Sequence, residues 1–277
     1  MQVSITHLST AGVLLEIGSL RIVTDPVLDT GMRRYGTGLP GLHLTRYRGT
    51  SLTAAELGPL DAILLSHPHH VDNLDEGGRA LFAQTREVIT NPHGKHHLKG
   101  VSNVTVLEDW GTTTLFGHDG FKLSVTATPA LHGPRWLPGT RHVSGFVLRW
   151  EGQKHGVLYL SGDTVFFDGI RQVANRFEVH TAVLHLGGVN LWPPLPPAIK
   201  FTLTAEQAVQ SIKMLTPRQV IPIHYEQAVW AHFREDISTY VQAFQAAGVD
   251  HLVRWIPNAL SWPAADGSDD RRFLFEI

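Results

Sequence analysis

Short apolar runs separated by turn-forming residues dominate the first part of the chain. The first 25 residues contain VSITHLS, VLLEI and RIVTDP, each of strand length and divided by Gly and Ser, which predicts a β-meander. DAILLS (61–66) is a continuous apolar run with a turn-like ending, typical of a buried strand. After it we expect a helix over 74–85, the strands EVIT and VTVL, and a short helix within HGKHHLKG.

The second part of the chain alternates between the two kinds of element. Expected strands are FKLSVTATP, VSGFVLRWEG, KHGVLYLSGD, TAVLHL, QVIPIH, HLVRW and RRFLFEI, and expected helices are 167–176, TAEQAVQSIKML and ISTYVQAFQAAG. This interleaving predicts two packed sheets with helices outside. Two segments lack a clear period: 28–59, interpreted as a long loop, and LWPPLPPAIK (191–200), whose prolines forbid a helix or a central strand.

Composition narrows the class of protein. The chain has 277 residues, 43% of them hydrophobic, which is enough for a sizeable core, and 23 Lys+Arg against 25 Asp+Glu leave no basic field for binding nucleic acid. The absence of cysteine excludes disulfides, a thiolate nucleophile and Cys-ligated metal. The N-terminal sequence lacks the basic and apolar regions of a signal peptide, and no apolar run approaches the roughly 20 residues needed to span a bilayer. We therefore expect a cytoplasmic protein with no membrane partner.

Side chains that can bind a metal stand at five predicted strand ends. The first is the SHPHHVDN segment (66–73), which follows DAILLS and holds three of the 17 histidines beside an aspartate. The others are His132 after SVTATPAL, Asp163 after VLYLSG, His185 in TAVLHL and His224 after QVIPI. Neutral imidazole and carboxylate are ligands that divalent transition metals favour. A lone strand-end histidine is usually structural, but five such ends together indicate a metal site.

The motifs HPHHVDNLD, TPALHGP, YLSGDT and IPIHYE, in this order, resemble the metallo-β-lactamase-fold hydrolases and, within them, the ascorbate-6-phosphate lactonase-like group. The likeness covers nearly the whole chain, including the early TDP and the FTLTAEQAV segment. It implies an α+β fold, a four-layer αββα sandwich of two mixed sheets with helices on both outer faces. It also implies one domain over residues 1–277, with pseudo-symmetric halves of about 1–135 and 136–277.

The resemblance further implies a binuclear metal site built on the family motif HxHxDH. The residues that it assigns to the metals are His67, His69 and His132 for the first, Asp72 and His224 for the second, and Asp163 as the bridge. This chain departs from the motif, because His70-Val71-Asp72-Asn73 carries one extra residue and has Asn where the family has His. Either a one-residue bulge returns Asp72 to its place, or His70 supplies the missing imidazole. A mononuclear or asymmetric site is the remaining alternative.

Such a site favours hydrolysis. A metal ion lowers the pKa of its bound water from 15.7 to about 7. We therefore expect a metal-dependent hydrolase that directs metal-bound hydroxide at a small ester, lactone or phosphodiester, with Asp72 and Asp163 as the catalytic carboxylates. Two divalent ions are expected, with zinc favoured over manganese and iron. The alternatives are a mononuclear iron dioxygenase-like enzyme and a non-catalytic metal-binding protein.

Residues around the expected ligands receive lesser roles. Asp25 in TDP is expected to hold the metal loop, His185 to support the site or fill the core, Tyr225 or His232 to protonate a leaving group, and Asn73 to bind weakly or to cap the next helix. His93, His96 and His97 are interpreted mainly as surface residues. Arginines of 28–59 and Arg135 are candidate contacts for an anionic small-molecule substrate, and Trp136 and Trp192 for an apolar pocket wall. A homo-oligomer, with the proline-rich segment as its interface, stays open.

Overall fold

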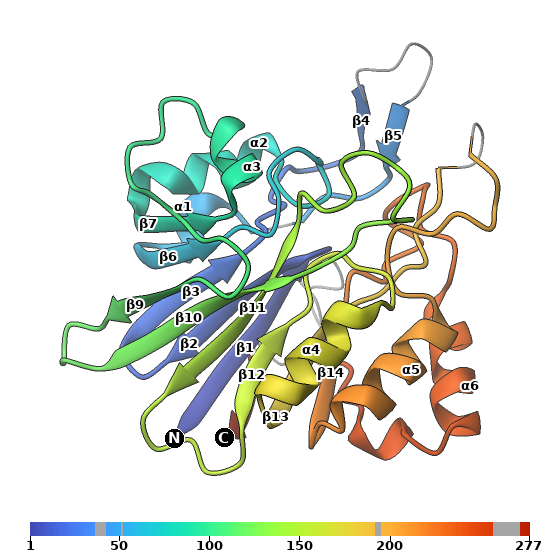
Figure 1. Cartoon of the computed structure of the whole chain (residues 1–277). Helices are drawn as coiled ribbons and strands as arrows, with labels where there is room; N and C mark the ends of the chain where they lie inside the picture. Colours follow the sequence, from blue (N-terminus) through green and yellow to red (C-terminus); the bar gives the residue numbers. More distant parts are fainter. Residues whose placement is uncertain (37–42, 51, 192–194, 257–271) are drawn as a thin grey trace, which may run out of the picture.

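Two facing sheets form the centre of the computed structural model, which describes residues 1–36, 43–50, 52–191, 195–256 and 272–277 (Figure 1). The strands of the first sheet, in spatial order, are β15 (Arg272–Glu276), β1 (Gln2–Ser9), β2 (Gly12–Ile17), β3 (Leu20–Thr24), β6 (Leu60–Leu64), β7 (Thr85–Thr90) and β8 (Val104–Val106). Pairing is antiparallel from β15 to β3 and parallel from β3 to β8. The first sheet is therefore mixed, as expected.

The second sheet is also mixed. Its strands, in spatial order, are β14 (Gln219–Ile223), β13 (Val179–His185), β12 (Val157–Leu160), β11 (Ser144–Trp150), β10 (Lys122–Pro129) and β9 (Thr112–Phe116). Strands β12 to β14 are parallel and β9 to β12 antiparallel. Apolar side chains of both sheets, such as Ile5, Leu15, Leu123 and Leu148, are fully buried in one cluster between them. This cluster is the main core of the sandwich.

Helices cover both outer faces (Figure 1). On the first sheet lie α1 (Ala54–Leu57), α2 (Glu76–Arg79), the 3₁₀ helix η1 (Ala80–Gln84) and α3 (Pro92–His96). On the second lie α4 (Asp168–Arg176), α5 (Ala205–Leu215) and α6 (Ile237–Ala246). Leu57 and Leu81 pack in a cluster with strand residues of the first sheet, and Ile170, Ile212 and Phe244 do so on the second. The predicted αββα layering is confirmed. No helix in the described ranges has the length and apolarity to cross a membrane.

Three local predictions were wrong. The helix expected over 74–85 is broken into α2 and η1, and an added Cβ at Gly78 would stand 2.0 Å from the Pro26 carbonyl oxygen, so this segment packs too closely for a regular helix face. In the expected strand HLVRW, the first two residues belong to the 3₁₀ helix η2 (Asp250–Leu252), and Val253 forms a single bridge with Val220. Segment 28–59 is not simply a loop, because it also contains α1 and the hairpin of β4 (Arg33–Gly36) and β5 (His43–Arg46).

The hydrophobic pattern did not predict this hairpin, because the most buried side chain of the hairpin is the charged Arg46. Arg46 has no exposed surface, its Nη1 lies 2.9 Å from Asp75 Oδ2, and its Nη2 donates to the Asp29 carbonyl. This arginine therefore holds the hairpin to the start of α2 and is withdrawn from any substrate. Residues 192–194 of the proline-rich segment lie outside the described residues. The division into halves near residue 135 stays a prediction; the switch between sheets falls between β8 and β9, and β15 returns to the first sheet.

Candidate metal centre

Strand ends from both sheets meet at one edge of the sandwich. His67 follows β6 of the first sheet, whereas His132, Asp163 and His224 follow β10, β12 and β14 of the second. The turn that presents Asp163 requires glycine, since Gly162 has a φ of +60° and an added Cβ would lie 2.4 Å from the Ser144 carbonyl oxygen. The edge therefore gathers residues up to about 157 positions apart, between His67 and His224, into one place.

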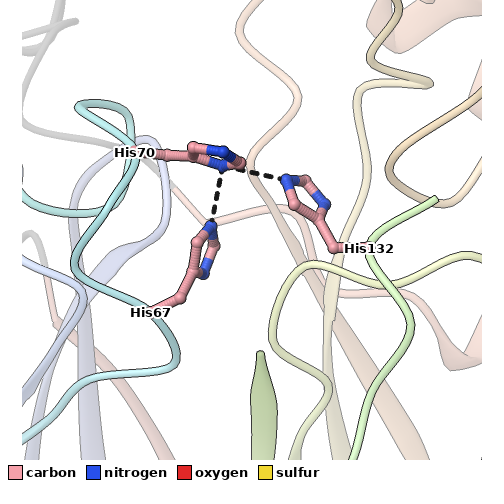
Figure 2. Close-up of side chains that lie close together, drawn as sticks. All are labelled: His67, His70 and His132. Atoms are coloured by element: carbon pink, nitrogen blue, oxygen red, sulfur yellow. Dashed lines mark hydrogen bonds between the residues drawn. The ribbon is translucent and has the colours of Figure 1, made fainter. Parts of the chain in front are cut away.

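Three imidazoles converge at this edge (Figure 2). The Nδ1 of His70 lies 3.1 Å from the Nε2 of His67 and 3.1 Å from the Nε2 of His132. His132 donates its Nδ1 hydrogen to the Phe201 carbonyl, 2.7 Å away, so its Nε2 presents a lone pair. His67 Nδ1 contacts Ser66 Oγ at 2.9 Å.

The tautomer of His67 follows from its neighbour. Ser66 Oγ donates its hydrogen to Asp25 Oδ1 at 3.0 Å, so it accepts from His67 and leaves the His67 Nε2 as a second lone pair. The His70 Nδ1 between these lone pairs carries one hydrogen at most. That hydrogen can satisfy only one of the two lone pairs, whereas a cation among the three nitrogens would satisfy all of them. The trio therefore fits a bound metal ion.

The trio differs from the predicted set of His67, His69 and His132. His70, not His69, joins the other two, and His69 instead lies with His93 and His97. The reason is the position of the extra residue. His70 and Asp72 keep the spacing of the second histidine and the aspartate in HxHxDH, so the insertion falls between His67 and His70.

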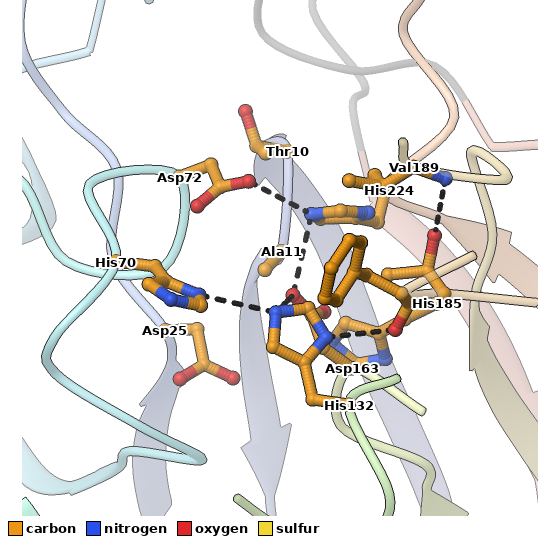
Figure 3. A network of polar contacts seen from close by, with 12 residues as sticks. Thr10, Ala11, Asp25, His70, Asp72, His132, Asp163, His185, Val189 and His224 are labelled. Carbon is orange, nitrogen blue, oxygen red and sulfur yellow. Dashed lines mark hydrogen bonds and ion pairs between the residues drawn. The ribbon is translucent and has the colours of Figure 1, made fainter. Parts of the chain in front are cut away.

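Asp163 lies close to both His132 and His224 (Figure 3). Its Oδ2 is 4.0 Å from the Nε2 of His67, 4.0 Å from that of His132 and 3.6 Å from that of His224. The side chain is fully buried, and within the described part of the chain neither oxygen makes a hydrogen bond of normal geometry. A buried carboxylate without partners is costly. Asp163 is thus placed where a cation on either side would satisfy it.

Asp72 and two histidines form the other side of the centre. Asp72 Oδ2 lies 2.9 Å from His232 Nε2 and 3.8 Å from His224 Nε2. His224 donates its Nδ1 hydrogen to the Leu186 carbonyl at 3.2 Å, which leaves its Nε2 facing Asp163 and Asp72. Its φ of +59° is uncommon for a residue with a side chain, and such strained backbone clusters at functional sites.

Most of these histidines are in the neutral form that binds a metal ion. Burial lowers the pKa of His70 and of His132 to about 4 and also lowers that of His67 well below its usual value, so all three are neutral at pH 7. Burial also acts to lower the pKa of His224, but Asp163 and Asp72 outweigh it and raise that pKa to about 9. Without an ion, His224 is therefore the cation that balances the carboxylates, and a metal would replace its proton.

Comparison with known proteins identifies the fold and the family. A model of the beta-lactamase superfamily domain matches residues 20–225, which is more than half of the chain. The chain belongs to the beta-lactamase superfamily. A UPF0173 metal-dependent hydrolase of Pelotomaculum thermopropionicum is 28% identical over 262 residues, covering 88% of this chain and 92% of the relative.

Solved structures share the architecture of this superfamily member. An isothiocyanate hydrolase from Delia radicum gut bacteria matches with a TM-score of 0.75 at 20% identity, covering 99% of this chain and 100% of the other. CmlA, a diiron beta-hydroxylase from Streptomyces venezuelae, matches with a TM-score of 0.65 at 17% identity, covering 99% of this chain and 54% of the other. The metallo-β-lactamase fold is confirmed, whereas the ascorbate-6-phosphate lactonase-like subgroup stays a prediction.

Two of the predicted supporting residues lie at the centre of this superfamily member. Asp25 accepts hydrogen bonds from the Ser66 backbone at 2.8 Å and from its hydroxyl at 3.0 Å, and so holds the segment that begins the metal motif. His185 contacts Ser161 Oγ through Nδ1 at 3.1 Å, and its ring centroid is 6.0 Å from that of His224. Asp25 is therefore placed to orient His67 through Ser66, whereas His185 lies near the ring of His224 and is hydrogen-bonded to Ser161.

The positions of Asn73 and Tyr225 differ from those that helix capping and proton donation would require. Asn73 does not cap the next helix, because Asp75 is the N-cap of α2 and accepts from Gly78 N at 2.8 Å. The Asn73 amide is instead fully buried beside Asp163, whose pKa it helps to lower against the larger effect of burial. Tyr225 packs against Trp255 in the cluster on the outer face of the second sheet, which places its ring away from the centre.

A cavity of about 410 Å³ opens beside the trio. One wall is built of imidazoles (His69, His70, His93, His132 and His142) and the other is mostly apolar (Leu137, Pro138, Leu191, Leu195 and Phe201). The volume suits a small molecule. Trp136 is 71% exposed and outside this lining, Arg135 lines a separate cavity of about 210 Å³, and Trp192 lies beyond the described residues.

Some contributors gave no signal in the sequence. The carbonyls of Phe201 and Leu186 select the tautomers of His132 and His224, and any residue type carries such a group. His142 stacks on His93 with a centroid separation of 3.7 Å at the cavity wall. Only the three-dimensional fold reveals these contacts.

Proposed function

We propose that this protein, a metal-dependent hydrolase of the beta-lactamase superfamily, holds two divalent ions and hydrolyses a small uncharged ester or lactone. The observation that carries the proposal is the convergence of three imidazole nitrogens beside a buried carboxylate that has no hydrogen-bond partner among the described residues. The trio of His67, His70 and His132 brings three ring nitrogens within 4.8 Å of one another, and the bare carboxylate of Asp163 lies beside it. Nitrogen and oxygen donors of this kind suit zinc first, then manganese or iron.

We assign His67, His70 and His132 to the first ion and Asp72, His224 and His232 to the second. Asp163 serves both, because its carboxylate is close to histidines of each set. His232 takes the part of the histidine that Asn73 replaces in the motif. Its support is a separation of 2.9 Å from Asp72, comparable to the 3.1 Å between nitrogens of the first set, and a buried position.

When bound, the ions would lower the pKa of water, so that hydroxide is available at neutral pH, and would stabilise the negative charge that develops on a substrate oxygen. The chain supplies orientation. Asp163 would contribute a negative charge to both ions, and Asp72 would hold the second ion together with His224 and His232. Fixed tautomers of His67 and His132 keep the trio from rotating. Phe201 and Leu195 hold the apolar part of the substrate and exclude bulk water.

The cavity wall supports an uncharged substrate over an anionic one. None of the described lining residues is Lys or Arg, and Arg46 is buried against Asp75. A phosphodiester would rely on the ions alone for its charge. Esters and lactones with a small apolar group, and isothiocyanates as a further electrophile, match the imidazole wall on one side and the leucine and phenylalanine wall on the other.

The test is elemental analysis of protein purified without added metal, followed by assays with esters, lactones, phosphodiesters and isothiocyanates. Two zinc or manganese ions at the centre, with turnover of an ester or lactone, would support the proposal. Asp163→Asn should lower activity by about 10³-fold or more, since it removes a charge shared by both ions. Bound iron with oxygen uptake would replace hydrolysis by redox chemistry. A protein that binds no metal after reconstitution would overturn the proposal.

A further inference from the structure

A second group of three histidines borders the centre, and its member His69 has its ring centroid 4.9 Å from that of His67 and 4.4 Å from that of His70. Among the described residues, His69, His93 and His97 bring one ring nitrogen each within 4.8 Å of the others. The Nε2 atoms of His93 and His97 are 3.1 Å apart. The ring of His69 is 5.2 Å from that of His93 and 5.6 Å from that of His97, between centroids. The three side chains thus form a compact cluster, named here the outer histidine group.

The local sequence explains the placement of two of its members. His93 and His97 are four positions apart on α3 and its C-cap, so their side chains project on the same side. Asn91 caps this helix by accepting from Gly94 N at 2.7 Å, and Pro92 occupies its first position. The pair is therefore presented by a helix turn with a defined start.

The third member is fixed relative to this helix. The Asn91 amide nitrogen donates to the Ser66 carbonyl at 2.9 Å, which ties α3 to the segment that carries His69. His142 stacks on the ring of His93 from the other side. Contacts from three parts of the chain thus hold the outer histidine group in one arrangement, which reduces the entropy lost when a ligand binds.

The chemistry of the group points to a cation. It contains three imidazoles and no carboxylate, and the buried Nδ1 of His69 has no hydrogen-bond partner within the described residues. Two Nε2 atoms at 3.1 Å share one hydrogen at most, as in the trio of the centre. Three neutral imidazoles with an open fourth position are a ligand set that zinc and neighbouring late transition metals accept.

We propose that His69, His93 and His97 form a third metal site, separate from the binuclear centre, that binds a divalent late transition-metal ion at the cavity wall. His69 and His93 both line the cavity, so the open position of the ion faces the space that a substrate enters. This proposal also assigns a structural role to the extra residue in HPHHVDN. It frees His69 from the first metal set and turns it toward α3. This site does not depend on hydrolysis at the centre.

The test is a comparison of metal content between matched variants. Wild type, His93→Ala/His97→Ala and the control His96→Ala are equilibrated with excess Zn²⁺, passed through a desalting column and analysed for zinc per chain. His96 is an exposed residue of the same helix outside the outer histidine group. We expect the double variant to hold one ion fewer than wild type and the control to match wild type. This difference persists even if the centre itself binds fewer ions than proposed.

Two further measurements separate loss of the proposed site from loss of the fold. Circular dichroism verifies that each variant is folded, and His97→Ala alone, at an exposed position, should weaken binding of the extra ion at least 10-fold in a titration with Co²⁺ followed by its visible absorption. Equal zinc content in wild type and the double variant would overturn the proposal. So would loss of every ion from the double variant, because that result would place these histidines in the centre.

Discussion

His232 Nε2 lies 2.9 Å from Asp72 Oδ2, although 160 positions separate the two residues in the chain. This contact joins the metal motif after β6 to the segment after β14. It also brings an imidazole close to the place where the family motif has a histidine and this chain has Asn73. On the proposed assignment, His232 would take the place of the motif histidine that Asn73 replaces.

Replacing His232 should weaken the second ion selectively. His232→Ala leaves Asp72 without its closest partner, and we expect the affinity for one of the two central ions to fall at least 10-fold to 100-fold. Competition with a chromophoric chelator measures this loss. His251→Ala, an exposed histidine of η2, is the matched control and should bind metal as wild type does. Unchanged affinity of His232→Ala for both ions would remove His232 from the site.

Restoring the motif histidine should rescue that loss. Asn73→His introduces an imidazole beside Asp163, so the double variant His232→Ala/Asn73→His should recover the ion that His232→Ala releases. Zinc per chain after desalting is the readout. A folded double variant that still lacks the ion would mean that His232 and the motif position are not equivalent.

The Ser66 hydroxyl should increase the affinity for the first ion without binding the ion itself. Ser66→Ala removes the acceptor of His67 Nδ1 and one donor to Asp25. We expect metal affinity of the trio to fall about 10-fold to 100-fold. Isothermal titration of the metal-free protein with Zn²⁺ checks this. Ser19→Ala, whose hydroxyl donates to exposed Asp119, should leave the titration unchanged, and an equal effect of both variants would contradict the assigned role.

The metal-free protein should be most stable near neutral pH. His70 and His132 have pKa values of about 4 in the folded chain against 6.5 unfolded, so below pH 6.5 the unfolded state binds more protons and stability is lost as pH falls toward 4. The loss is about 1.4 kcal/mol per pH unit for each such histidine. The pKa of His224 is raised to about 9, so its stabilisation is present below pH 6.5 and is lost as pH rises toward 9.

Urea unfolding of metal-free protein from pH 4 to pH 9 measures this profile. His132→Gln removes one of the titrating groups and should reduce the acid slope by about 1.4 kcal/mol per pH unit. The alkaline slope should not change in this variant. Stability that is constant between pH 6.5 and pH 4 would show that these imidazoles are protonated in the folded chain.

The buried pair of Arg46 and Asp75 should stabilise the fold and take no part in metal binding or catalysis. Arg46→Ala leaves the Asp75 carboxylate buried without its charged partner, which costs about 3–5 kcal/mol of unfolding free energy. Arg48→Ala, at an exposed position two residues away, should change it by less than about 0.5 kcal/mol. Urea denaturation of the two variants gives the comparison. A change below about 1 kcal/mol in Arg46→Ala would contradict a structural role for the pair.

The sequence predicted the scaffold better than the details of the site. Strand ends before His67, Asp163 and His224 follow from apolar runs, since strands buried on both faces carry a continuous signal. The strand before His132 is indicated by alternation of buried and less buried positions. The β4–β5 hairpin carries no such signal, because the residue that it buries is Arg46. Its place is set by a charge pair with α2, which no local period reveals.

Spacing alone did not decide between His69 and His70. Both precede Asp72 closely, and the choice depends on which ring the turn after His67 directs toward His132. The partner of Asp72 was equally hidden, since His232 reaches it only after the chain has passed through α5 and β14. Motifs therefore located the centre, whereas contacts between distant segments select its members.

The pairing of β15 with β1 has a consequence for synthesis of the chain. Residues 2–6 of β1 receive their outer partner from residues 272–276, so the first sheet stays open at that side until those residues have been synthesised. An open strand edge pairs readily with other chains. Sheet closure, and with it protection from aggregation, is thus a late event that the emerging polypeptide cannot complete early.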